Sequence, residues 1–288
     1  MVRVAVLVRG VGDVGSAVAH RLFSDGYAVA VHDSAQPATP RRKMAFADAV
    51  FDGAAKLDGV EARLAANLDM VKALMARNVV AIWVGSFPEL LEAVKPKILV
   101  DARMRKRAIP EILRGSAALT IGLGPNFEAG ATCDVAIETS WDALGNVIYA
   151  GTPLPLAGEP RVLGGHGRDR YVYAPCEGVF RTRVEIGDRV EQGQSVGTIS
   201  ETVLAAPVSG VLRGLTHDGV PVTARTKVIE VDPRSRAAEV PVSLSGPARS
   251  PPAWPTRSGD SPIATSPGAG DQPRARTERS GAATSEAP

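Results

Sequence analysis

Cysteine, histidine and aromatic residues are scarce in this chain of 288 residues. It contains two cysteines, Cys133 and Cys176, and four histidines. No Cys-x-x-Cys pair or Cys/His spacing typical of a metal site occurs, and two isolated cysteines cannot build a disulfide framework. The sequence therefore predicts no metal site and no disulfide-dependent fold.

A strong charge of one sign and long apolar runs are also absent. The formal net charge is +2, and no zinc-finger, aromatic RNA-binding or basic-helix pattern occurs, so we expect no nucleic-acid partner. No run approaches about eighteen apolar residues and no basic leader with an apolar core opens the chain, so we expect no membrane partner and a cytoplasmic location.

Recognisable catalytic constellations are missing as well. The histidines show no nucleophile partner, and no Gly-x-Ser-x-Gly nucleophile elbow occurs. Cys133 is a candidate sulfur-handling thiol if it is exposed, with a buried structural cysteine as the alternative. Glu138 and Asp13 are candidate acid, base or metal-binding residues. The sequence assigns no catalytic residue and leaves open whether the chain is an enzyme.

The most informative segment that is present is a turn with three spaced glycines. Apolar residues 4–8 precede Gly10, Gly12 and Gly15, and a helix-compatible segment follows. Glycines there permit a tight turn, close approach of an anion to the backbone and close packing of helix on strand. The helix N-terminus then offers free N–H groups to a phosphate. Together with Asp13, these glycines are candidate ligand-binding residues.

Asp33 follows a second apolar strand, residues 27–32. It lies at roughly the twenty-residue distance at which a ribose-binding carboxylate is expected in dinucleotide sites. A loop acid or a helix cap is the alternative. We therefore add Asp33 to the candidate ligand-binding residues.

Two basic clusters follow predicted strands, one at residues 41–43 and one at residues 103–107. Arginine forks match phosphate oxygens and lysine adds a point charge. We therefore predict that four cations of these clusters bind an anion: Arg41, Arg42, Arg103 and Lys106. The alternative is that the clusters are solvated loops.

A second glycine turn, with Gly122 and Gly124, follows the apolar strand at 118–121. Because ligands bind at the carboxyl ends of parallel strands, both glycine turns are expected to face one ligand. A purely structural turn is the alternative.

Apolar strands alternate with helical patterns over residues 1–150. This pattern predicts a Rossmann-like α/β domain with a mostly parallel sheet, interrupted by a short hairpin at 51–63. A linker follows at 151–167. Residues 236–288 are rich in Pro, Ser, Gly, Ala and Arg, a composition that predicts a disordered tail.

An internal repeat occupies the predicted second domain, residues 168–235. Residues 174–181 return as 206–213, and residues 187–190 return as 219–222. Two interlocked copies resemble the all-β barrel-sandwich hybrid of biotinyl and lipoyl carrier domains. Those domains present a lysine between the halves, where this chain has Ser200 to Leu204. We therefore expect neither biotin nor lipoate.

Several longer motifs occur together in the chain. They lie at Val8 to Asp13, Arg41 to Val50, Val100 to Ala102, Ile121 to Gly130 and Gly210 to Gly219. Together they resemble the selenium-dependent molybdenum hydroxylase system proteins of the YqeB type, from about residue 4 to residue 234. The resemblance implies an accessory role in maturing molybdenum hydroxylases, with the hydroxylase or its maturation machinery as the partner.

The predicted ligand is a phosphate-bearing small molecule, either molybdenum cofactor or a nucleotide. Two alternatives stay open. The first is an NAD(P)-dependent oxidoreductase with Asp33 on the ribose, and the second is a non-catalytic interaction module.

Overall fold

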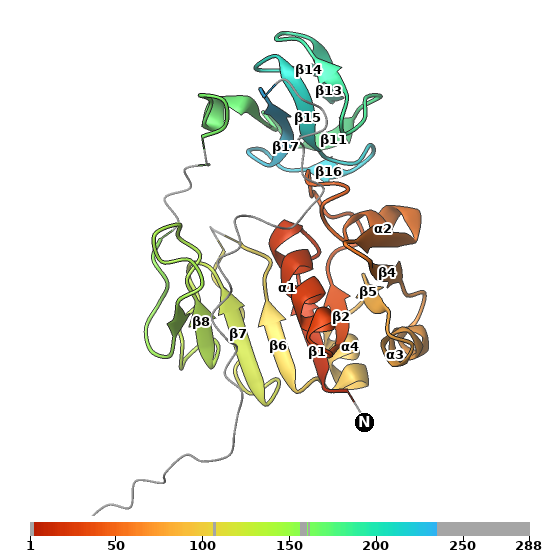
Figure 1. The fold of residues 1–288 in the computed structure, drawn as a ribbon, viewed down its shortest axis with the longest axis vertical. Coiled ribbons are helices and arrows are strands. Elements are labelled where there is room, and N and C mark those ends of the chain that lie inside the picture. Colours follow the sequence, from red (N-terminus) through yellow and green to blue (C-terminus); the bar gives the residue numbers. More distant parts are fainter. Residues whose placement is uncertain (1–2, 106–107, 156–159, 161, 235–288) are drawn as a thin grey trace, which may run out of the picture. The chain divides into compact units, whose positions relative to one another are not determined.

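The computed structural model describes residues 3–105, 108–155, 160 and 162–234 (Figure 1). All of them lie in one compact unit that spans Met1–Pro252. The tail predicted at 236–288 and the candidate Lys106 lie outside the described residues. Within the described residues, every helix is too short or too polar to cross a bilayer.

The first sheet has nine strands in the order β3-β4-β5-β2-β1-β6-β7-β8-β9. Their bounds are β1 (Ala5–Arg9), β2 (Ala28–His32), β3 (Ala54–Leu57), β4 (Val60–Leu64), β5 (Val80–Trp83), β6 (Ile98–Asp101), β7 (Leu119–Leu123), β8 (Val135–Ile137) and β9 (Val147–Ile148). Neighbouring strands from β4 to β8 run parallel, whereas β3 and β9 are antiparallel to their neighbours. The sheet is therefore mixed, with an antiparallel strand at each edge.

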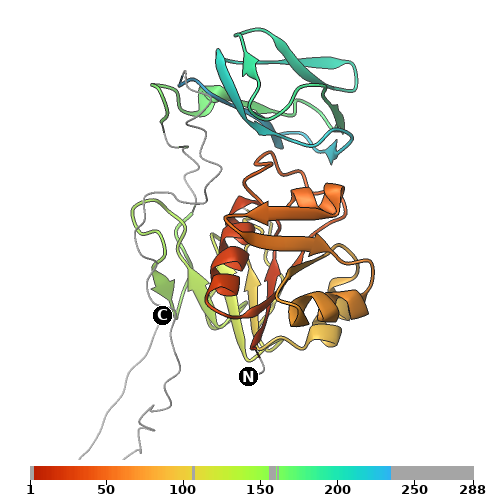
Figure 2. The ribbon, with the colours of Figure 1, turned by 45° about the vertical axis from the view of Figure 1, so that its right-hand side comes forward.

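Among the described residues, the helices that accompany this sheet are α1 (Asp13–Ser24), α2 (Asp48–Asp52), α3 (Leu68–Ala76) and α4 (Phe87–Val94). Helix α1 packs on β1 and β2, and α3 and α4 pack against each other on the other face (Figures 1 and 2). The Asn67 side chain caps α3 and Ser86 caps α4, which satisfies N–H groups that the first turn leaves unpaired.

Apolar side chains from the helices and strands form the core of this region. The spacing of Val71, Leu74 and Met75 in the sequence predicts one apolar face of a helix, and in α3 all three are buried in this core. The hairpin predicted near residues 51–63 is confirmed as the β3–β4 pair.

The C-terminal strands form two four-stranded antiparallel sheets, ordered β10-β17-β15-β12 and β14-β13-β11-β16. The strands are β10 (Tyr171–Tyr173), β11 (Gly178–Arg181), β12 (Arg189–Val190), β13 (Ser195–Ile199), β14 (Thr202–Ala205), β15 (Gly210–Leu215), β16 (Pro221–Val222) and β17 (Lys227–Asp232). A short 3-10 helix, Arg168–Arg170, precedes β10.

The internal repeat is visible in the strand pairing. The short strand β12 of the first copy pairs with β15 of the second copy, and β16 of the second copy pairs with β11 of the first. Side chains of both copies share one core, which includes Phe180, Ile199 and Leu212. The predicted interlocking of the two copies is therefore confirmed.

The fold class predicted from the sequence, however, is wrong. A Rossmann-like parallel sheet followed by a barrel-sandwich domain was expected, and the structure has a nine-stranded mixed sheet followed by two separate antiparallel sheets. Two features explain the difference. The two-residue turn between β3 and β4 permits only antiparallel pairing, and no helix lies among the described residues between β6 and β9.

Candidate functional site

Polar side chains meet at the carboxyl ends of the central strands. In register across neighbouring strands lie His32 of β2, Arg9 of β1, Asp101 of β6 and Gly122 of β7. Parallel strands bring these positions together although they are far apart in the sequence. This edge is where the first glycine turn leaves β1.

The glycine turn has the tight geometry that its sequence predicts. Gly10 has φ +108°, and a Cβ on Gly15 would lie 1.9 Å from the carbonyl oxygen of Gly10, so neither position has room for a side chain. Gly12 is the N-cap of α1, and no side chain caps the helix there. The N-terminal end of α1 therefore carries N–H groups and the positive end of the helix dipole without a side-chain acceptor at the N-cap.

The two acidic candidates both contact this turn. Asp33 accepts hydrogen bonds from the backbone N–H of Val11 at 2.8 Å and from that of Ser34 at 2.7 Å. Asp13 accepts one from Val14 N–H at 3.0 Å. Asp33 thus fixes the turn onto the end of β2, and each of its oxygens keeps a second lone pair for a ligand hydroxyl.

A group of two arginines and two carboxylates, here the edge cluster, lies beside the turn and comprises Arg9, Asp101, Arg103 and Glu111. Arg103 binds both oxygens of Asp101 at 2.5–3.1 Å, and Arg9, only 4% exposed, pairs with Asp101 at 3.6 Å and with Glu111 at 2.5 Å. Burial alone would lower the pKa of Arg103, but hydrogen bonding to Asp101 raises it. The charges of the edge cluster are balanced, two against two.

A small cavity next to the edge cluster is lined by Asp101, Arg103, Glu111 and Phe127, among others. Its volume of about 20 Å³ is enough for a single water molecule. Phe87 covers the other side of Arg9, with the guanidinium carbon 3.9 Å from the ring centroid. The charged groups of the edge cluster are thus paired with one another, and the cavity beside them is too small for a ligand larger than water.

The second glycine turn has a structural explanation at both candidate positions. A Cβ on Gly122 would lie 2.2 Å from the ring of Phe127, so this glycine makes room for an aromatic side chain. Gly124 has φ +93° and packs against the Met104 sulfur. The packing of both glycines accounts for their presence without a ligand.

Arg41 and Arg42 are directed to the C-terminal sheets. Arg41 binds both carboxylate oxygens of Glu230 at 3.1 and 3.2 Å, and Arg42 pairs with Glu185 at 3.3 Å. The segment that follows β2 is also fixed to β15 by a hydrogen bond from Leu215 N–H to the carbonyl of Pro40. These two candidates therefore lie at the contact between the first sheet and the C-terminal sheets.

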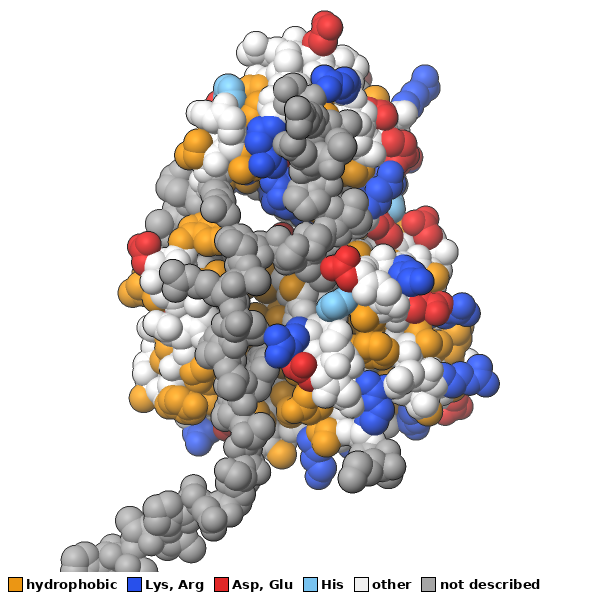
Figure 3. Space-filling model, viewed as in Figure 1, with side chains coloured by type: hydrophobic (Ala, Val, Ile, Leu, Met, Phe, Trp, Pro, Cys, Tyr) orange, Lys and Arg blue, Asp and Glu red, His pale blue; other side chains and the backbone are white. Residues whose placement is uncertain are grey.

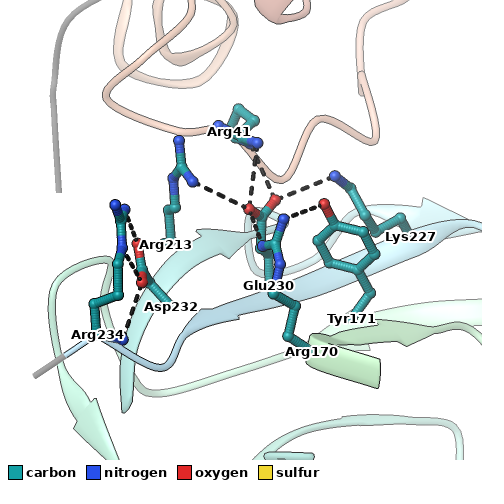
Figure 4. A network of polar contacts seen from close by, with 8 residues as sticks. All are labelled: Arg41, Arg170, Tyr171, Arg213, Lys227, Glu230, Asp232 and Arg234. Carbon is teal, nitrogen blue, oxygen red and sulfur yellow. Dashed lines mark hydrogen bonds and ion pairs between the residues drawn. The ribbon is translucent and has the colours of Figure 1, made fainter. Parts of the chain in front are cut away.

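Around Glu230 lies a group that the sequence analysis did not identify (Figure 4). It is called the Glu230 cluster here and comprises Arg41, Arg170, Arg213, Lys227 and Glu230. The carboxylate is fully buried, and its ion-pair distances are 2.6 Å to Arg170, 3.2 Å to Lys227 and 3.8 Å to Arg213. Burial alone would raise the pKa of Glu230, but Lys227, Arg41 and Arg170 lower it to about 2.

The remaining candidates are buried and structural. Cys133 is fully buried, and burial raises the pKa of its thiol, which disfavours the reactive thiolate. Glu138 accepts backbone hydrogen bonds from Thr139, Ser140 and Leu154. In the part of the chain that the structure describes, no group of three or more His, Cys, Asp or Glu residues is placed to hold a metal ion.

Comparison with known proteins gives one sequence relative. No family model matches the chain. The chain is 38% identical over 247 residues to the uncharacterized protein YqeB of Escherichia coli K12. The match covers 85% of this chain and 45% of YqeB. It supports the YqeB part of the resemblance seen in the sequence, while the chain spans less than half of its relative.

Among solved structures, two matches carry aspartoacylase names. A succinylglutamate desuccinylase/aspartoacylase from Rhodobacter sphaeroides is 18% identical, with 49% of this chain and 59% of that chain covered and a TM-score of 0.21. An aspartoacylase family protein from Mesorhizobium loti is 12% identical, with 80% and 85% covered and a TM-score of 0.23. Such TM-scores do not establish a shared fold.

Proposed function

We propose that this chain binds a phosphate-bearing, nucleotide-like ligand at the N-terminus of α1. The observation that carries this proposal is the uncapped end of α1 behind a turn in which Gly10 and Gly15 leave no room for side chains. Such an end binds anions because its N–H groups and the helix dipole point toward them. Asp33 is held against the same turn, and we assign to it a hydrogen bond from a ribose hydroxyl of the ligand.

Asp13 sets a condition on the ligand. Its carboxylate accepts the N–H of Val14 within the first turn of α1 and would repel a phosphate placed beside it. A bound phosphate therefore needs cations from outside the helix to offset this charge. Arg103 is paired with Asp101 and Glu111, so it adds no net charge there.

The proposed biological role is accessory, in the maturation of molybdenum hydroxylases. It rests on the motifs shared with YqeB-type proteins and on the similarity to YqeB itself, which is uncharacterized. The ligand that fits this role is molybdenum cofactor or its dinucleotide form, since both carry phosphate. The second candidate is an NAD(P)-dependent oxidoreductase, and the position of Asp33 at the end of β2 favours it.

A binding comparison separates these functions. Purified protein is titrated with molybdenum cofactor, its cytidine dinucleotide form, CTP, NADH and NADPH, in the wild type and in Gly12→Asp. The added carboxylate at the N-cap blocks anion approach. Gly12→Ala is the matched control because its Cβ would lie 3.7 Å from Thr39 Oγ1, an ordinary contact.

The accessory role predicts saturable cofactor binding that Gly12→Asp abolishes and Gly12→Ala keeps. A preference for NADH or NADPH would favour the oxidoreductase. If none of the five ligands binds, the proposed site at α1 is wrong and an interaction module is left.

A further inference from the structure

The Glu230 cluster has more positive than negative charge. Four cationic side chains surround a single carboxylate, and the next acid along β17, Asp232, is bound by Arg234 at 2.6 Å. Figure 4 shows all four cations directed toward Glu230. Figure 3 shows Lys and Arg side chains on the C-terminal sheets and also on the rest of this face. Within the described residues, four cations therefore share the one carboxylate of Glu230.

Arg213 is the cation that the protein itself satisfies least. Its ion pair with Glu230 is 3.8 Å long, beyond hydrogen-bonding distance, and within the described residues its Nε has no hydrogen-bond partner. Burial lowers the pKa of Arg213, and the neighbouring Arg41 lowers it further. The Arg213 side chain is nevertheless 16% exposed, so a small anion can reach it.

Two β-bulges place these side chains on one face. Between β15 and β17, Leu212 pairs with Val231 and Gly214 with Glu230, so Arg213 is the extra residue. Between β10 and β17, Val172 pairs with Ile229 and Tyr173 with Lys227, so Val228 is the extra residue. The second bulge turns Lys227 toward Glu230 despite their odd spacing. Bulges commonly redirect side chains at functional sites.

The cluster is close to the N-terminus of α1. Thr39 lies 3.7 Å from the position of a Cβ on Gly12, and Arg41 follows two residues later in contact with Glu230. Burial lowers the pKa of Lys227, whereas Glu230 and also Asp13, in the first turn of α1, act in the opposite direction. The segment that carries Thr39 and Arg41 therefore joins the N-terminus of α1 to the Glu230 cluster.

From this arrangement we infer that Arg213 and Lys227 bind an anionic group of the ligand whose phosphate lies at α1. The inference rests on the proposed function and names its ligand class, a nucleotide with a diphosphate. One phosphate lies at Gly12 and the other at the Glu230 cluster. Glu230 holds the cations in place, and the ligand adds negative charge beside Arg213 and Lys227.

Inorganic pyrophosphate is the probe that tests this inference. Calorimetric titration at low ionic strength compares the wild type with Arg213→Gln and Lys227→Gln. The matched control is Arg181→Gln, which removes an exposed arginine of the same C-terminal sheets that pairs with Asp218. Circular dichroism and thermal unfolding verify that each variant folds, and Arg213→Lys tests whether the positive charge suffices.

We expect saturable binding to the wild type that weakens with added salt. Arg213→Gln and Lys227→Gln each lose about tenfold in affinity, as for a charged hydrogen bond, while Arg181→Gln binds like the wild type and Arg213→Lys keeps part of the affinity. No saturable binding to the wild type, or unchanged affinity in both cluster variants, overturns the inference.

Gly12→Asp separates this inference from the proposed function. If the site at α1 is wrong but the cluster binds anions, pyrophosphate affinity falls in the two cluster variants and is unchanged in Gly12→Asp. If only the site at α1 is right, Gly12→Asp loses binding and the cluster variants keep it. Loss in both sets supports the full account.

Discussion

The edge cluster and the Glu230 cluster both consist of cationic side chains and carboxylates, but the ratio of cations to carboxylates differs. The edge cluster has two arginines and two carboxylates, whereas the Glu230 cluster has four cations and one carboxylate. The neighbouring carboxylate raises the pKa of Arg103, although burial opposes it, while burial and Arg41 lower the pKa of Arg213. In the edge cluster each arginine has carboxylate partners within the protein. In the Glu230 cluster the cations outnumber the carboxylate, so the cluster has the capacity to hold an anion.

The largest expected effect comes from removing the central carboxylate. Glu230→Gln leaves buried cations without their partner, and loss of one member of a buried ion pair typically costs about 3–5 kcal/mol. Urea unfolding at neutral pH measures the loss, and Glu185→Gln, at an exposed carboxylate, is the control. Added pyrophosphate is expected to restore part of the stability. A loss below about 1 kcal/mol would mean that Glu230 does not organise the cluster.

Lowering the pH should remove the stabilisation that the Glu230 carboxylate provides. The folded-state pKa of Glu230 is about 2, against an ordinary value of 4.5, so its stabilisation is complete above pH 4.5 and is lost as the pH falls toward 2. The difference amounts to about 3 kcal/mol. The unfolding free energies of the wild type and Glu230→Gln, measured from pH 7 to pH 2, should converge in that window. A constant difference would contradict the pKa assignment.

In the edge cluster, Asp101→Asn should cost about 2 kcal/mol. Arg9 is almost fully buried and would keep Glu111 alone as its carboxylate partner. Glu111→Gln should cost less because the Glu111 side chain is 52% exposed. Chemical denaturation of both variants provides the measurement, and an equal cost for the two would show that burial does not set the strength of these pairs.

The smallest effect should come from removing a surplus cation. Without ligand, Arg213→Gln should change the unfolding free energy by less than about 1 kcal/mol, because the excess charge repels, whereas Arg103→Gln should lower it by about 1–2 kcal/mol. Added pyrophosphate should raise the thermal unfolding temperature of Arg103→Gln and should hardly change that of Arg213→Gln. If Arg213→Gln proves the more damaging of the two, the distinction between balanced and unbalanced clusters fails.

Features set by neighbouring residues could be predicted from the sequence. The turn at Gly10 and Gly15, the apolar face of α3 and the β3–β4 hairpin each depend on a few adjacent residues. The antiparallel direction of the other edge strand, β9, was not predicted, because a helical connection between strands was assumed where β6 to β9 have none among the described residues. The ligand-binding roles of Gly12 and Asp33 stay predictions.

The sequence contains no local pattern that predicts the Glu230 cluster. Arg41 and Glu230 are 189 residues apart, and the bulges at Arg213 and Val228 shift the face on which side chains lie without changing composition. The sequence predicts that Arg41 binds an anion from its charge and its place after the second strand, and this role stays a prediction. Its carboxylate partner could be seen only after folding brought β17 to the segment that follows β2.

The central claim is that the Glu230 cluster and the N-terminus of α1 form one anion site. A crystal structure of the protein with pyrophosphate tests it most directly. The account predicts one phosphate group hydrogen-bonded to Arg213 and Lys227 and the other at the backbone N–H groups after Gly12, with the ion pairs of Glu230 retained. Pyrophosphate bound elsewhere, with both positions empty, would contradict it.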